Sequence, residues 1–95
     1  MICQLEITPE AELDIYTIFA NIRLQVGLEA AKKAASQLKK QLNTLSIFPE
    51  SGRAGGCEGT REIALTGQPY IAIYEHNNNI VTIVRVLYGG AENIV

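Results

Sequence analysis

The sequence predicts an α+β domain of the order β-α-α-β-β-β, in which a helical hairpin packs on one face of a small, mainly antiparallel sheet. Three observations predict it: a strand-like alternation at the N-terminus, two consecutive stretches with helical periodicity, and three strand-like segments after a glycine-rich stretch. The chain has 95 residues, of which 47% are hydrophobic. Since about 100 to 150 residues form one hydrophobic core, we expect a single domain over residues 1–95.

The N-terminal segment alternates between two faces, as a half-buried strand does. One face carries Ile2, Gln4 and Glu6, and the other carries Cys3, Leu5 and Ile7. A helix then begins, because Thr8 is a favourable N-cap residue and Pro9 suits the first helical position. Gly27 marks its end. The apolar residues of this helix recur with helical spacing at Ala11, Ile15, Ile18, Phe19, Ile22 and Val26.

A second helix follows almost at once, so the two helices form an antiparallel hairpin. Its apolar face carries Ala31, Ala34, Ala35, Leu38, Leu42 and Leu45. Its other face carries mostly lysines, namely Lys32, Lys33, Lys39 and Lys40. This lysine face is either a solvated outer surface or a docking surface for an acidic partner. Phe48 ends the helix, because the residue before a proline avoids the helical conformation.

The rest of the chain predicts a loop and three strands. Residues 49–59 contain four glycines and no hydrophobic periodicity, which predicts a surface loop. Strand-like segments follow at residues 60–65, 70–76 and 80–88, and the asparagines at 77–79 favour a tight hairpin turn. Neither face of the last two segments is plainly polar. We therefore hypothesise that a partner covers part of the second face of the sheet.

Composition excludes several classes of function. The chain has ten acidic and eight basic residues and a net charge of −2, so it lacks the positive field that bulk binding of nucleic acid requires. It has no signal-peptide pattern and no apolar run of roughly 18 residues, so a cytoplasmic protein without membrane association is expected. Cys3 and Cys57 read as free thiols, and neither a metal nor a cofactor is expected.

Three arginines are the only cationic residues after the two helices: Arg53, Arg61 and Arg85. An arginine on an apolar strand needs a partner, because burial of an unpaired charge is costly. One interpretation is a structural salt bridge of Arg61 or Arg85 with Glu62 or Glu75. The other is recognition of an anion or of a protein partner, and the sequence leaves both open.

Three tyrosines in the last two strands are further candidates. The rings of Tyr70, Tyr74 and Tyr88 are amphipathic and suit a core edge or an interface. Tyr88 directly precedes Gly89 and Gly90, where a turn would leave its hydroxyl group accessible. His76 lies at a strand end and is assigned no catalytic role.

Four sequence stretches, at residues 48–53, 59–63, 69–74 and 83–90, together resemble the RelE/ParE superfamily of toxins from bacterial toxin–antitoxin systems. They read FPESGR, GTREI, PYIAIY and IVRVLYGG. The resemblance covers almost the whole chain. It implies a toxin neutralised by a cognate antitoxin, part of which folds on the toxin surface. It also implies a role in plasmid stabilisation or stress response, and either a homodimer or a hetero-oligomer with the antitoxin.

Two activities occur in that superfamily. The RelE-like activity is ribosome-dependent cleavage of mRNA, for which the resemblance assigns catalytic roles to Arg61, Arg85 and Tyr88. This chain has no lysine after Lys40, has Tyr88 where related toxins often carry histidine, and has Glu92 where arginine is frequent. The acidic balance also suits a ribosomal RNA surface badly.

The ParE-like activity is inhibition of DNA gyrase by trapping the cleaved complex, which requires no catalytic residues of the toxin's own. The GTRE, PY and RVLYGG elements resemble this branch more closely, so we favour gyrase as the target over the ribosome and mRNA. A non-toxic binding module with the same fold is the third interpretation. The residues expected to bind the target or the antitoxin are Arg53, Arg61, Tyr70, Tyr74, Arg85 and Tyr88.

Overall fold

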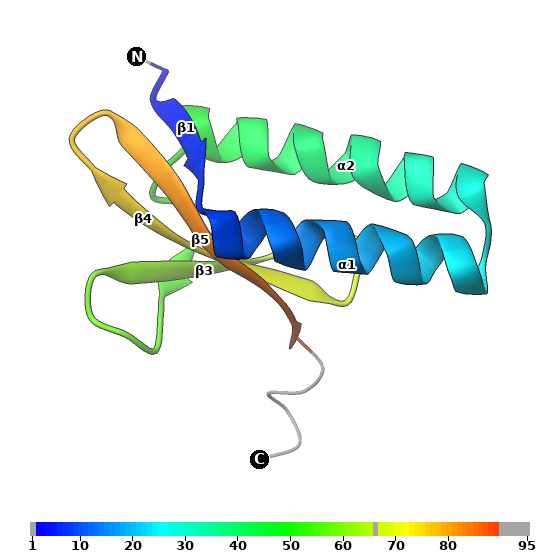
Figure 1. Ribbon diagram of the computed structural model, residues 1–95. Helices are drawn as coiled ribbons and strands as arrows, with labels where there is room; N and C mark the ends of the chain where they lie inside the picture. Colours follow the sequence, from blue (N-terminus) through cyan, green and yellow to red (C-terminus); the bar gives the residue numbers. More distant parts are fainter. Residues whose placement is uncertain (1, 66, 90–95) are drawn as a thin grey trace.

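Two layers make up the protein, a helical hairpin and a five-stranded sheet (Figure 1). The computed structural model describes residues 2–65 and 67–89. The hairpin covers one face of the sheet, and both helices contact its strands. This arrangement confirms the predicted α+β class.

The hairpin consists of α1, Pro9–Gln25, and α2, Leu28–Ile47. Thr8 caps α1, since its hydroxyl oxygen accepts a hydrogen bond of 3.0 Å from the backbone N–H of Ala11. Gly27 joins the helices with a φ of +131°, a backbone conformation that residues with a Cβ atom rarely adopt. The predicted start, junction and end of the hairpin are therefore confirmed.

The sheet has the strand order β1-β5-β4-β3-β2. Its strands are β1 (Gln4–Ile7), β2 (Arg53–Ala54), β3 (Thr60–Ala64), β4 (Tyr70–Asn77) and β5 (Ile80–Tyr88). Only β1 and β5 pair in parallel, and the other pairs are antiparallel. The turn between β4 and β5 is tight, as predicted, and Asn78 has a φ of +55° within it.

The interpretation of residues 49–59 as a loop is wrong in part, because they contain β2. Arg53 pairs with Glu62 and Ala54 pairs with Arg61. A strand of two residues is too short to show an alternating pattern, so its sequence carries no strand signal. The glycines that follow form the turn of a β2–β3 hairpin, which lies below the β4–β5 turn in Figure 1.

The core lies between the helices and one face of the sheet. Its largest fully buried side chains are Tyr74, Leu45, Ile83 and Val81. Residues of β4 alternate across the sheet, so that Ala72 and Tyr74 are buried. The neighbouring residues Ile71 and Ile73 lie half-buried on the second face.

Three of the most exposed large apolar side chains lie on α1. On α1, Leu13 is 67% exposed, Tyr16 is 73% exposed and Leu24 is 84% exposed. The coverage of the second face of the sheet by a partner stays a prediction. Among the described residues, no helix is long and apolar enough to span a bilayer.

Candidate functional site

The last part of β5 is bordered by α1 instead of by a strand. β1 ends at Ile7, which pairs with Ile83. Beyond this point the Thr8 hydroxyl donates a hydrogen bond of 2.8 Å to the carbonyl oxygen of Val84. The Asp14 carboxylate accepts one of 3.0 Å from the N–H of Val86. The side chains of Thr8, the N-cap of α1, and of Asp14 in α1 thus satisfy backbone groups that a neighbouring strand would otherwise satisfy.

Arg85 forms a two-pronged ion pair with Asp14 on this border. Its Nε atom lies 2.7 Å from Oδ2 and its Nη2 atom 3.0 Å from Oδ1. The hydrogen bonds from Arg85 hold the pKa of the Asp14 carboxyl below its usual range and outweigh partial burial, which acts in the opposite direction. The predicted partners Glu62 and Glu75 are therefore wrong for Arg85. A register shift after Ile83 changes the course of β5 just before this residue.

Asp14 is expected to make stability depend on pH. The pKa of Asp14 is lower in the folded protein than in the unfolded chain. Its ion pair therefore contributes fully to folding stability above the unfolded-state pKa of about 3.9, and this contribution is lost as pH falls through the folded-state pKa. Asp14→Asn should therefore lower the urea midpoint at pH 7, and its difference from the native protein should shrink by pH 2. Glu12→Gln, on the exposed side of α1, is the matched control. A difference that stayed constant between these pH values would contradict this role.

Tyr70 and Tyr88 pair across β4 and β5 beside this ion pair. Their ring centroids lie 6.0 Å apart with the planes at 70°, an edge-to-face contact. Tyr88 is nevertheless 56% exposed. The two rings border a groove of about 440 Å³ between α1 and β5, which we call the β5 groove. Its lining residues are Leu13, Asp14, Thr17, Ile18, Asn21, Tyr70, Val86, Leu87 and Tyr88.

Tyr74 lies elsewhere and is fully buried. Its hydroxyl group donates a hydrogen bond of 2.9 Å to the carbonyl oxygen of Pro49 and accepts one of 2.9 Å from the N–H of Gly52. Arg61 fixes the same segment, since its Nη1 atom donates to the carbonyl oxygens of Gly52 at 2.9 Å and Glu50 at 3.4 Å. Both side chains therefore hold residues 49–52 against the sheet.

Arg53 follows this segment and points outward. Its side chain is 73% exposed and lies 3.4 Å from the Glu62 carboxylate. An ion pair this exposed contributes little to stability. Arg53 is therefore the one member of this group whose charge is directed towards solvent.

The structure divides the sequence-predicted residues into two groups instead of one site. Tyr70 and Tyr88 line the β5 groove, and Arg85 binds Asp14 at its border, whereas Arg53, Arg61 and Tyr74 gather around the segment before β2. Arg61 and Arg85 lie on the strands that flank β4, but Arg61 donates to backbone carbonyl oxygens before β2 whereas Arg85 donates to the Asp14 carboxylate of α1.

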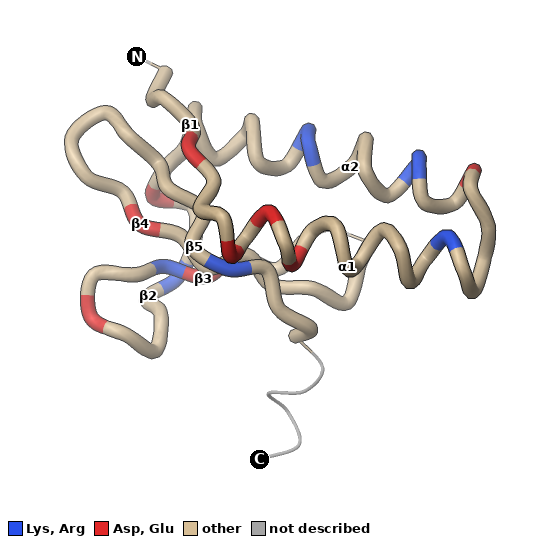
Figure 2. The backbone as a smooth tube through the Cα atoms, in the orientation of Figure 1, with Lys and Arg blue, Asp and Glu red and all other residues tan. Residues whose placement is uncertain are grey.

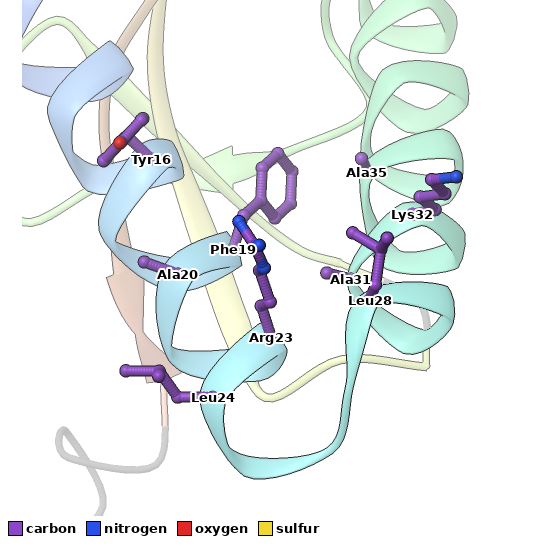
Figure 3. A pocket seen from close by; sticks show the side chains of 9 residues that line it. All are labelled: Tyr16, Phe19, Ala20, Arg23, Leu24, Leu28, Ala31, Lys32 and Ala35. Atoms are coloured by element: carbon purple, nitrogen blue, oxygen red, sulfur yellow. The ribbon is translucent and has the colours of Figure 1, made fainter.

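A second groove, between α1 and α2, was not predicted from the sequence. This hairpin groove has a volume of about 620 Å³. Figure 3 shows Phe19 of α1 extending into the space between the helices and Arg23 running along α1 beside it, with Leu28 and Ala31 on the facing side of α2. The complete lining consists of Tyr16, Phe19, Ala20, Arg23, Leu24, Leu28, Ala31, Lys32 and Ala35.

The signal for this groove was present in the sequence of α1. Tyr16, Ala20 and Leu24, which line it, repeat at intervals of four residues and form an apolar stripe, which Leu13 of the β5 groove extends. They lie away from the stripe used to predict the core face. Periodicity reveals both stripes but does not show which of them the chain's own sheet covers.

The fold places the protein in a class of small α+β proteins with known structures. The chromosomal ParDE TA system from P. aeruginosa matches with a TM-score of 0.83 and 24% identity, over 92% of this chain and 96% of that chain. The free E. coli toxin RelE, in a mutant form, matches with a TM-score of 0.68 and 19% identity, over 99% and 90%. The E. coli DinJ-YafQ toxin–antitoxin complex matches with 0.62 and 15%, over 96% and 97%. These similarities establish the fold.

The family follows from the sequence itself. Residues 5–92 match the family described as the ParE toxin of type II toxin–antitoxin system, parDE. The chain belongs to this family of toxins, as its resemblance predicted. Among curated proteins, none matches the sequence significantly.

Proposed function

We propose that this chain is a toxin that inhibits DNA gyrase and that a cognate antitoxin neutralises it. The match of residues 5–92 to the ParE toxin family is the observation that carries the proposal. The net charge of −2 supports it, because a toxin that grips ribosomal RNA needs cations to neutralise phosphates.

The arrangement of the arginines supports an inhibitor that acts by binding. Cleavage of RNA needs groups that activate the 2′-hydroxyl, stabilise the phosphorane and protonate the leaving oxygen at one place. In the described part of the chain, Arg61 is bound to backbone carbonyls and Arg85 to Asp14. Tyr88 packs on Tyr70. These residues thus serve separate local contacts.

The proposed gyrase contacts are the β5 groove with Arg85 at its border, and Arg53 on the opposite edge strand of the sheet. Tyr88 offers an exposed ring that Tyr70 supports, and tyrosine is common at the centre of protein interfaces. Asp14 orients Arg85, whose side chain is 45% exposed. Arg53 supplies a second exposed cation, while Arg61 and Tyr74 position the segment that carries it.

A supercoiling assay with purified gyrase tests this proposal. The native protein should inhibit supercoiling and accumulate cleaved DNA, and Tyr88→Ala should raise the concentration needed about 10-fold or more. Tyr16→Ala is the matched control, because Tyr16 is also exposed but lies in the hairpin groove. Cleavage of mRNA only in the presence of ribosomes, or inactivity in both assays, would overturn the proposal.

A further inference from the structure

Four paired residues form a row across the second face of the sheet, the face that the hairpin does not cover (Figure 1). Arg53 of β2 pairs with Glu62 of β3, and Glu62 pairs with Ile73 of β4. Ile73 in turn pairs with Arg85 of β5. Residues directly opposite one another share a face, and Ile73 faces away from the side on which Tyr74 is buried. The row thus has an arginine at each end, about 14 Å apart at about 4.8 Å per strand.

Both arginines of this row are more exposed than the carboxylates that they bind. The side chain of Arg53 is 73% exposed and that of Glu62 is 14% exposed, while the values for Arg85 and Asp14 are 45% and 16%. Glu62 also accepts a hydrogen bond of 3.3 Å from the N–H of Gly56. In Figure 2, blue segments lie near the labels β2, β3 and β5, with red segments of α1 beside β5. The row is therefore locally basic on an acidic chain.

The middle of the row is apolar. Ile73 is half-buried, as are Ile71 and Leu87, which pair with each other further along the same face. A hollow of about 320 Å³ lies beside these residues, and Arg53, Glu62 and Ile71 are among its lining residues. An apolar side chain of a partner would find apolar surface here, and contact would remove both from water.

The neighbouring row of the same face favours a protein over DNA as the occupant. Glu75 of β4 pairs there with Thr82 of β5, and Thr82 pairs with Glu6 of β1. DNA presents an unbroken line of phosphates, which these two carboxylates would repel. A protein segment places its acidic side chains only where the arginines lie, with an apolar side chain between them.

We propose that the second face of the sheet binds an extended segment of gyrase that crosses the strands and has two acidic residues four positions apart, with an apolar residue midway. Alternate residues of an extended segment face the same side, and four residues span about 13 Å, close to the separation of the two arginines. The acidic residues meet Arg53 and Arg85, and the apolar residue meets Ile73. Leu87 also lines the β5 groove, so the two surfaces are continuous. The inference rests on the proposed function, because it takes gyrase to be the occupant.

Titration of purified gyrase with the native chain and its variants tests the basic end of the row. Arg53→Ala should raise the Kd about 10-fold, whereas Arg53→Lys, which keeps the charge, should raise it less than about 3-fold. Lys39→Ala is the matched control, because it removes the same charge from an exposed position on the lysine face of α2 and should leave the Kd unchanged. The fold should survive all three changes, since the Arg53 ion pair is exposed, and circular dichroism will verify this.

A photo-crosslinking amino acid in place of Ile71 identifies the occupant. Ile71 lines the hollow, so the crosslink should join the chain to a gyrase peptide with the acidic, apolar and acidic residues at the proposed spacing. Mass spectrometry of the crosslinked peptide measures this. A crosslink to DNA, to the product of the adjacent gene alone, or to a gyrase peptide without this spacing would overturn the inference.

The same measurements separate this inference from the proposed function. If the native chain inhibits supercoiling but Arg53→Ala binds gyrase as tightly as the native chain does, the docking of this segment is wrong and the proposed function stands. If the native chain neither binds gyrase nor inhibits it, both proposals fail.

Discussion

Tyr74→Ala is expected to lower the free energy of unfolding by about 3–5 kcal/mol, the usual cost of removing a buried aromatic ring. Tyr74 is 0% exposed and belongs to the core formed by the helices and β4. Alanine would leave a cavity there and remove the hydroxyl group that holds residues 49–52. Since small domains have about 5–15 kcal/mol of stability, the variant should be close to unfolding.

Tyr74→Phe distinguishes the contribution of the hydroxyl group to stability from that of the ring. It should cost about 1–3 kcal/mol, because the buried N–H of Gly52 and the carbonyl oxygen of Pro49 both lose a partner. Urea unfolding followed by circular dichroism measures both variants. A phenylalanine variant as stable as the native protein would show that these hydrogen bonds contribute nothing, and equal losses for both variants would contradict a core role for the ring.

Gly52→Ala should cost about 1–3 kcal/mol, because the added methyl group has no space. A Cβ atom at this position would lie 2.6 Å from the Tyr74 hydroxyl oxygen and 2.8 Å from the carbonyl oxygen of Glu62. The second contact is with the backbone of β3, which cannot move without disturbing the pairing of β2 and β3. The contact with the Tyr74 hydroxyl oxygen would displace this group from its hydrogen bonds.

Gly56→Ala provides the matched control for this substitution. A Cβ atom there meets nothing within 4 Å, so this change should be neutral or stabilise by up to about 1 kcal/mol through the unfolded chain. Urea midpoints of the two variants give the comparison. Equal midpoints would show that close approach at Gly52 does not determine how the glycine-rich segment folds.

The fold could be predicted because its signals are local. Thr8 and Pro9 start the first helix, Gly27 separates the two helices and Pro49 ends the second. Each acts through backbone conformation or a hydrogen bond within a few residues, which a sequence displays directly. The turn at Asn78 is predictable for the same reason.

The partners of the candidate site could not be predicted, because they are distant in the chain. Arg85 and Asp14 are 71 residues apart, and a glutamate on a neighbouring strand was the obvious alternative. The register shift in β5 and the position of α1 along its border determine the actual partner. Likewise, Tyr74 and Tyr70 look equivalent in sequence, but only Tyr74 lies under residues 49–52.

The exposed surface of α1 shows a different limit of prediction from the sequence. Apolar periodicity shows that a side of a helix avoids water, and it does so equally for the domain core and for an interface. On α1, Ile18 and Leu24 give the same signal, yet the first is 8% exposed and the second 84% exposed. Only the position of the sheet distinguishes them.

The decisive measurement of toxicity is the growth of bacterial cells that express this chain, with and without the protein encoded by the adjacent gene. The chain alone should arrest growth, cleaved DNA bound to gyrase should accumulate, and co-expression of the adjacent gene should restore growth. Normal growth of cells that contain the folded native chain, with no cleaved DNA, would contradict the proposed function.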